Sequence, residues 1–308
     1  MIERLLNYVR PKRPKTAQAS ELEGDGNVVV QVSGDGNSVV VGYSYLRLTR
    51  FLNRRFSALP DPTETDLLQA HSRSIALLGR ETELSELWDW LNDGRAISAR
   101  VIIGSAGRGK SRLALELCEQ AAAQGWRAGF LTGADLERFR AQQNAGEWGW
   151  NAPTLAVIDY AATGAKGLNA WLRELSDHAA LTQVGTASPL RLLLLERQAE
   201  PNAAGSWWHT VFGGGDGTGQ AVGRLLDRPE PVVLQALEGD ASRRAVMAAM
   251  LEQIGSELQV PAAREDAYFD QRLSALTWGG EPLFLMMAAL LASKSDFAAV
   301  LGPVEIQD

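Results

Sequence analysis

The stretch VIIGSAGRGKS, residues 101–111, joins an apolar run to a glycine-rich loop and then to a helical pattern. It fits G-x-x-x-x-G-K-[ST], the spacing of a phosphate-binding P-loop. Glycines let backbone N–H groups curl around a β-phosphate, and the N-terminus of the following helix adds its positive end. A strand before the loop and a helix after it are the context that separates the motif from a chance match. The sequence therefore predicts a nucleoside triphosphate site.

The residues of this loop have separate expected roles. Lys110 is expected to reach the β- and γ-phosphates, and the Ser111 hydroxyl is placed to ligate Mg²⁺. The residues expected around the nucleotide at this loop are Gly104, Gly107, Gly109, Lys110, Ser111 and Arg112.

The metal also needs a carboxylate, usually at the end of a neighbouring hydrophobic strand. Asp159 closes the apolar run TLAVID and is predicted to fill this role. It is followed by Tyr160 and two alanines, so no second carboxylate stands beside it to activate a water molecule. This predicts slow hydrolysis, or a base supplied from elsewhere in the chain.

Arg197 ends the apolar run PLRLLLLER and points toward the γ-phosphate if its strand lies beside the P-loop strand. Glu196 is the other candidate for that role, and the alternative is that Arg197 only forms a surface ion pair. The catalytic set predicted from sequence is thus Lys110, Asp159 and Arg197.

Apolar runs alternate with helical patterns through the middle of the chain. Continuous apolar runs bounded by polar residues suit strands that are buried on both faces of a parallel sheet. The predicted strands cover 99–105, 126–131, 154–161, 189–197 and 231–237, and from about residue 242 the pattern becomes helical. The order predicts an α/β fold: a parallel-sheet P-loop NTPase domain followed by a small helical domain.

ATP is favoured over GTP as the nucleotide. Guanine specificity usually needs an [NT]-K-x-D loop, and the similar SKSD at 293–296 ends a helical run far beyond the last predicted strand. The sequence Asp-Tyr-Ala-Ala from Asp159 also lacks the glycine that a GTPase switch has at its fourth position.

The composition excludes several other classes. A net charge of −7 argues against a general nucleic-acid binder, so no specific nucleic acid is expected as a partner. The single cysteine, Cys118, excludes an internal disulfide and fits a reducing compartment. The three histidines lie far apart without a cysteine partner, which argues against a zinc site. Neither a signal peptide nor a membrane-spanning run is found, so a cytoplasmic protein is expected.

Beyond the P-loop, three segments resemble the STAND class of P-loop ATPases, and in particular bacterial NLR-like signalling proteins. LLGRETELSELWDWL (77–91) resembles the Gly-Arg-Glu segment that lies against the adenine in that class. LRLLLLERQAEPNAAGSWW (190–208) resembles its sensor strand, which ends in an arginine. GGEPLFLMMAALLA (279–292) resembles the glycine-x-proline motif of its helical domain.

The resemblance covers about residues 72–300 and implies that Arg80 and Pro282 also approach bound ATP or ADP. It implies a switch that ADP holds closed and that opens and oligomerises when ATP replaces it. The chain departs from the class in two ways. Tyr160 replaces the second acidic residue, and the chain stops soon after the first helical segment, without a winged helix or repeat array. Sensing would then fall to another subunit, or the chain is a fragment.

GDGNVVVQVSGDGNSVVVG (24–42) repeats a Gly-Asp-Gly-Asn turn before two valine-rich runs. Such runs, without charge or proline, have the features of a cross-β segment. VQVSGDGN (30–37) is similar to RHIM-like amyloid signalling motifs, from which it departs by the inserted Ser33. The alternative is a β-hairpin or two rungs of a small β-solenoid, and both interpretations make the segment a self-association device.

Five parts are therefore predicted: a basic arm (1–23), a β-rich signalling or assembly segment (24–42), a linker (43–71), the NTPase domain (72–238) and a helical lid (239–308). The expected partners are further copies of the chain when ATP is bound and an effector protein that carries a matching β-motif. The basic arm suits anionic lipid, but a solvated arm is favoured over membrane contact. Two alternatives stay open, an AAA-like ATPase whose repeat is only a scaffold and a non-hydrolysing adaptor with a structural nucleotide.

Overall fold

The computed structural model describes residues 46–49, 55–59, 61–141, 150, 152–181, 188–213, 218–262, 265–266 and 268–302. All of them belong to one compact unit, Ser44–Asp308. The predicted basic arm (1–23) and the repeat segment (24–42) lie outside the described residues.

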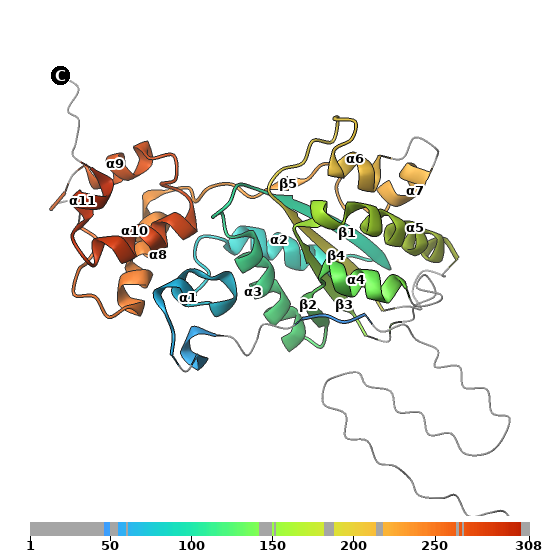
Figure 1. The fold of residues 1–308 in the computed structure, drawn as a ribbon, viewed down its shortest axis with the longest axis horizontal. Helices are drawn as coiled ribbons and strands as arrows, with labels where there is room; N and C mark the ends of the chain where they lie inside the picture. The colour runs from blue at the N-terminus through green and yellow to red at the C-terminus, as the bar shows by residue number, and fades with distance from the viewer. Residues whose placement is uncertain are drawn as a thin grey trace, which may run out of the picture. The chain divides into compact units, whose positions relative to one another are not determined.

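A five-stranded parallel sheet forms the centre of this unit, in the order β2-β3-β4-β1-β5 (Figure 1). Its strands are β1 (Ile97–Ile103), β2 (Arg127–Phe130), β3 (Thr154–Asp159), β4 (Leu190–Glu196) and β5 (Val232–Val233). The five apolar runs predicted as strands are thus confirmed, although β5 has only two residues in the ladder.

Helices follow the strands and then continue alone to the C-terminal part of the unit. The α-helices are α1 (Glu64–Leu68), α2 (Glu81–Leu91), α3 (Lys110–Ala123), α4 (Gly133–Arg140), α5 (Ala165–Leu181), α6 (Trp207–Phe212), α7 (Thr218–Gly223), α8 (Asp240–Gln253), α9 (Phe269–Ala275), α10 (Pro282–Ala292) and α11 (Phe297–Leu301). Short 3-10 helices cover Phe56–Ala58, Ala70–Ser72 and Ala161–Gly164. The predicted α/β fold with a helical C-terminal region is confirmed.

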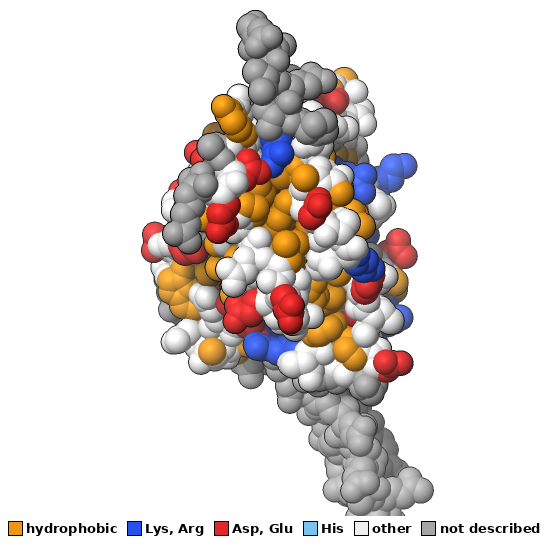
Figure 2. Space-filling model, turned by 90° about the vertical axis from the view of Figure 1, so that its left-hand side faces the viewer, with side chains coloured by type: hydrophobic (Ala, Val, Ile, Leu, Met, Phe, Trp, Pro, Cys, Tyr) orange, Lys and Arg blue, Asp and Glu red, His pale blue; other side chains and the backbone are white. Residues whose placement is uncertain are grey.

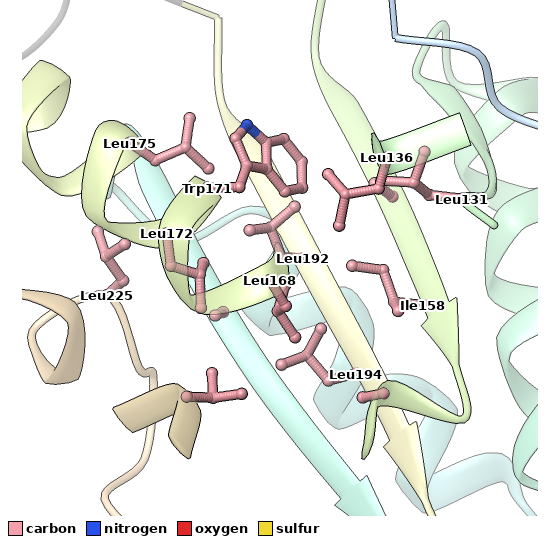
Figure 3. Close-up of a cluster of buried hydrophobic side chains, with 14 of the residues drawn as sticks. Leu131, Leu136, Ile158, Leu168, Trp171, Leu172, Leu175, Leu192, Leu194 and Leu225 are labelled. Atoms are coloured by element: carbon pink, nitrogen blue, oxygen red, sulfur yellow. The ribbon is translucent and has the colours of Figure 1, made fainter. Parts of the chain in front are cut away.

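Alternate residues of each strand face opposite sides of the sheet, as strand geometry requires. On one side, Leu192 and Leu194 of β4 pack with Trp171 of α5 and with α4, α6 and α7 (Figure 3). On the other side, Leu193 and Leu195 pack with α2 and α3. Burying one such side chain stabilises the fold by roughly 1.5–3 kcal/mol. A run of consecutive leucines is therefore favourable in β4, because both faces of the sheet are covered by helices.

Arg191 interrupts the leucine run of β4 and is nevertheless completely buried. Its guanidinium donates to the backbone oxygens of Trp90, Asp93 and Arg95, and Nη2 lies 2.8 Å from Asp93 Oδ1. A buried charge is tolerated only when it is paired and hydrogen-bonded, and these acceptors at the end of α2 meet that need. Arg191 therefore fastens α2 to the sheet.

Two parts of the predicted linker, 43–71, pack against the rest of the unit, one against the sheet and the other against the C-terminal helices. Leu46 is buried in the sheet core, and Thr49 forms an antiparallel bridge with Phe130 at the edge of β2, with N–H···O distances of 2.7 and 3.0 Å. Leu67 of α1 packs into the core of the C-terminal helices.

Among the described residues, no helix is both long and apolar enough to cross a membrane.

The C-terminal helices α8 to α11 have a core of their own, with residues such as Met247, Phe269 and Leu285. Figure 2 shows the end of the unit that these helices form, where apolar side chains are exposed between acidic ones. Three of the exposed apolar side chains, Phe284, Met287 and Leu291, follow one another at helical spacing on α10.

Candidate functional site

The loop between β1 and α3 has the backbone of a phosphate-binding loop. Gly107 and Gly109 both have a φ of +89°, a conformation that residues with a Cβ rarely adopt. Gly104 needs glycine for another reason, since a Cβ there would lie 3.0 Å from the carbonyl oxygen of Leu234. The glycine spacing of the motif is therefore what this turn requires, and Gly109 directly precedes the first turn of α3.

Lys110 lies in the first turn of α3 and folds over the loop. Its Nζ donates to the carbonyl oxygens of Gly104 and Ser105, at 2.6 and 3.1 Å. Burial lowers the pKa of Lys110 below its ordinary value, and the nearby carboxylates of Asp159 and Glu196 oppose this shift. The ammonium group is thus held over the loop beside two carboxylates.

Asp159 and Ser111 meet although they belong to different elements. Ser111 Oγ donates a hydrogen bond of 2.6 Å to Asp159 Oδ2, and Asp159 Oδ1 accepts one of 3.0 Å from the N–H of Tyr160. The expectation that the carboxylate strand neighbours the P-loop strand is wrong, because β4 lies between β3 and β1. The pair still forms because the carboxyl ends of all parallel strands meet at one edge of the sheet.

Tyr160, which stands where the resemblance expects a second acidic residue, has a left-handed backbone with φ 56° and ψ 51°. This is uncommon for a bulky residue and recurs at sites where function constrains the chain. Its side chain is 55% exposed, so no packing of the phenol explains the conformation.

A cavity of about 310 Å³ opens in front of the loop, and we call it the P-loop cavity. Its polar lining includes the loop, Lys110, Ser111, Asp159, Glu196 and Arg197, and its apolar lining includes Leu68, Ile75, Leu77, Leu78, Val246 and Met286. Its lining includes these predicted site residues: Arg80, Gly107, Gly109, Lys110, Ser111, Arg112, Asp159, Arg197 and Pro282. Gly104 begins the loop and contributes the carbonyl oxygen that Lys110 contacts.

Arg80 and Arg112 lie on the wall of the cavity, but both guanidinium groups have protein partners. Arg80 is 3% exposed and donates to Glu83 and to the carbonyl oxygens of Arg108 and Gln235. It therefore ties the start of α2 to the loop. Arg112 pairs with Glu116, one turn further along α3, at 2.9 Å.

The prediction for Arg197 required its strand to lie beside the P-loop strand. Arg197 directly follows β4, and β4 pairs in parallel with β1, so this condition is met. Its side chain is exposed and lines the cavity. The carboxylate of Glu196, directly before it, is turned back onto the backbone: Oε1 accepts from the N–H of Arg197 at 2.7 Å and Oε2 from the N–H of Ala162 at 3.0 Å.

The start of α10 is bonded to the loop. Glu281 Oε1 accepts hydrogen bonds of 3.1 Å from Ser105 Oγ and from Arg108 Nε, and the N–H of Leu283 donates to the carbonyl oxygen of Gly107 at 3.2 Å. We call these three hydrogen bonds the lid clasp. Pro282, predicted to approach a nucleotide, is the first residue of α10 and lines the cavity beside them.

Sequence reasoning missed Glu281. The residue is 7% exposed, and its second oxygen, Oε2, is buried without a hydrogen-bond partner among the described residues. The only signal in the sequence was its position between Gly280 and Pro282 in the segment that resembles a glycine-x-proline motif. Its partner Arg108 is 173 positions away, so no local pattern connects them.

Comparisons with known proteins find distant likenesses only. No protein-family model and no curated protein sequence matches the chain. Among solved structures, the Walker-type ATPase PABY2304 of Pyrococcus abyssi aligns with a TM-score of 0.47 and 11% identity, over 80% of this chain and 72% of that one. AMPPCP-bound DnaA from Aquifex aeolicus aligns with a TM-score of 0.44 and 15% identity, over 80% and 67% of the two chains. NtrX from Brucella abortus, in complex with ADP, aligns with a TM-score of 0.43 and 20% identity, over 76% and 56%.

These TM-scores are all below 0.5, so the assignment of the fold rests on the chain's own geometry. That geometry consists of the parallel sheet, the glycine-rich loop between β1 and α3, and the carboxylate at the end of β3 that meets Ser111. The described part of this chain has a P-loop NTPase fold.

Proposed function

We propose that the chain is an ATP- and ADP-binding molecular switch of the STAND type. The observation that carries the proposal is the lid clasp: the loop that would hold the phosphates is also the loop to which α10 is bonded. A phosphate that reshapes or tightens the loop would therefore act directly on the C-terminal helices.

The P-loop cavity suits a nucleotide in size and polarity. Small-molecule sites commonly have volumes of roughly 300–1,000 Å³, with apolar walls and a few placed polar groups. The phosphates would lie against the loop N–H groups, the start of α3 and Lys110. The base would lie against apolar side chains of the lining, such as Ile75, Leu78 and Met286.

Mg²⁺ fits the polar lining of the cavity at Ser111 and Asp159. Magnesium prefers oxygen ligands and is usually bound by one or two carboxylates together with substrate phosphates. Ser111 Oγ and Asp159 Oδ2 are already 2.6 Å apart and present a hydroxyl and a carboxylate at one point. These two residues would hold the ion, which neutralises phosphate charge when it is bound.

The rest of the proposed switch rests on the sequence resemblance. ADP keeps the C-terminal helices on the loop, and exchange for ATP releases them and allows copies of the chain to assemble. Assembly brings the segments 24–42 to a high local concentration, at which cross-β pairing with one another or with a matching effector becomes favourable. Bacterial antiphage defence or programmed cell death is the biology that the resemblance implies.

Nucleotide binding is tested by native mass spectrometry of the full chain and of two lysine variants. Lys110→Ala removes the ammonium group from the loop, whereas Lys166→Ala removes an exposed lysine from α5. We expect one ADP or ATP per chain in the wild type and in K166A, and none in K110A. A wild-type chain that binds no nucleotide at millimolar ATP and Mg²⁺ would contradict the proposal.

Switching is tested by light scattering of the full chain with ADP and with a non-hydrolysable ATP analogue. Monomers with ADP and oligomers with the analogue are expected. A variant with Val30→Lys and Val40→Lys should still oligomerise but should lose any fibre diffraction at the strand spacing of about 4.7 Å. An identical assembly state with both nucleotides would exclude the switch while leaving nucleotide binding intact.

A further inference from the structure

Hydrolysis of ATP requires a group that orients or deprotonates the attacking water. The chain after Asp159 offers none, because Tyr160, Ala161 and Ala162 follow it. A carboxylate from another part of the chain would have to reach the P-loop cavity instead. Such a role rests on the proposed function, because only a chain that binds ATP can hydrolyse it.

Glu196 is at the right edge of the sheet. It is the last residue of β4, which lies between the P-loop strand β1 and the Asp159 strand β3. Ile103, which ends β1, is its register partner, and Asp159 is the partner of the preceding residue, Leu195. The strand order therefore places Glu196 between the loop and the proposed metal carboxylate.

The lining of the cavity narrows the choice of carboxylate. Among the described residues that line it, only Asp159 and Glu196 are acidic. Asp159 accepts the Ser111 hydroxyl hydrogen bond and is assigned to the metal. Glu281 is close enough to affect Lys110 electrostatically, but it is held by the lid clasp and does not line the cavity.

The carboxylate of Glu196 is also fixed in orientation. The side chain is 9% exposed, and each of its oxygens accepts one backbone N–H, from Arg197 and from Ala162. An ionised carboxylate has about four lone-pair sites, so two remain after these bonds. A group held in this way can accept a hydrogen bond from a water molecule without first having to be ordered.

We infer that Glu196 is the catalytic carboxylate of ATP hydrolysis in this chain, in place of the residue missing after Asp159. It orients the attacking water and takes one of its protons. The water oxygen bonds to the γ-phosphorus while the bond from that phosphorus to the β,γ-bridging oxygen breaks, and its electron pair stays on the leaving ADP. The proton on Glu196 then returns to the phosphate product or to solvent.

The test compares Glu196→Gln and Glu196→Asp with Glu200→Gln, which changes an exposed glutamate in the segment that follows β4. For each full-length variant, the dissociation constants of ATP and ADP and the single-turnover rate of phosphate release are measured across pH. General-base catalysis is worth about 10²–10⁴-fold, so E196Q should slow release at least about 100-fold with dissociation constants within about threefold of wild type. E196D, which keeps the carboxylate, should recover part of the rate, and E200Q should match the wild type.

The pH profile separates a base from a structural support. The wild-type rate should fall on acidification, as a carboxylate is protonated, and the residual rate of E196Q should lack this acid limb. E196Q that binds ATP and hydrolyses it at the wild-type rate overturns the inference. So does a wild-type chain that binds ATP and never hydrolyses it, whereas a chain that binds no nucleotide overturns the proposed function itself.

E196D decides the case if E196Q loses both binding and turnover. Wild-type binding with a slowed step in E196D supports the catalytic role. Loss of binding in E196D as well, or turnover at the wild-type rate, makes Glu196 a structural residue and overturns the inference.

Discussion

Ser111 Oγ and Asp159 Oδ2 lie 2.6 Å apart in a hydrogen bond between residues 48 positions apart in the chain. Ser111 lies in the first turn of α3, after the loop that follows β1, and Asp159 closes β3. In the sheet, β4 lies between β1 and β3. This hydrogen-bonded hydroxyl and carboxylate are the pair that, in the proposed function, would hold Mg²⁺.

Replacing this carboxylate should remove the dependence of nucleotide affinity on Mg²⁺. In D159N, the gain in ATP affinity that Mg²⁺ gives the wild type should shrink about 10–100-fold or more, because losing even an outer-shell partner of a bound metal usually costs that much in metal affinity. Titration calorimetry with and without EDTA measures it. D177N, which changes an exposed residue of α5, is the control and should behave as the wild type. If the ATP affinity of D159N depended on Mg²⁺ as strongly as that of the wild type, Asp159 would not be a residue that holds the metal.

Loosening the lid clasp should free α10 from the loop. Glu281→Gln keeps the shape of the side chain but removes the charge that pairs with Arg108, and hydrogen bonds to charged groups contribute about 1.5–3 kcal/mol each. Hydrogen–deuterium exchange should therefore become faster in peptides covering 104–109 and 281–286. E252Q, at an exposed position of α8, should leave both peptides unchanged. Unaltered exchange in E281Q would show that the clasp does not hold the helix.

Gly107 and Gly125 form a matched pair for testing the contact between the loop and α10. Their φ angles are +89° and +87°, so alanine at either position adopts a strained backbone, at a cost of about 1–2 kcal/mol. A Cβ at Gly107 would also lie 3.0 Å from Phe284 Cε2, whereas nothing lies within 4 Å at Gly125. G107A should lose more unfolding free energy in urea than G125A, because Phe284 or the loop must shift to make room for the added methyl group. Equal losses in the two variants would mean that Phe284 moves aside freely.

Cys118 should be inert in the native chain. Burial raises the pKa of its thiol from the ordinary 9.0 to about 12, and the side chain is 7% exposed. The thiolate fraction near pH 8 is then about 1,000-fold lower than for a free cysteine, so iodoacetamide should label the native chain far more slowly than the chain in urea. Because the chain has one cysteine, the label reports on this residue alone.

The same shift in pKa predicts a direction for stability. The folded state favours the neutral thiol, so the contribution of Cys118 to stability is fully present below pH 9 and is lost as the pH rises toward 12. Cys118→Ala should remove this part of the alkaline loss of unfolding free energy. Rapid native labelling would contradict both expectations.

The sequence by itself determined the local parts of this protein. The loop glycines, Lys110 and Ser111 were predictable because a P-loop is one strand–turn–helix, whose geometry depends on residues a few positions apart. The strands were predictable because leucine-rich runs such as that of β4 are stable only when both faces are covered. Asp159 was predictable as the polar residue that closes one of these runs.

Only the tertiary structure decided how these parts meet. The strand order puts β4 between β1 and β3, and this places Glu196, the last residue of β4, beside the loop. For the same reason β3, which ends in Asp159, does not neighbour β1, contrary to the expectation from the sequence. Arg191 is buried because the end of α2 supplies its acceptors, which no property of β4 indicates. The pairing of Glu281 with Arg108 likewise depends on how α10 packs. Such contacts join residues about 100 or more positions apart, and the energy that selects them comes from packing and desolvation of the whole unit, which short-range sequence patterns do not encode.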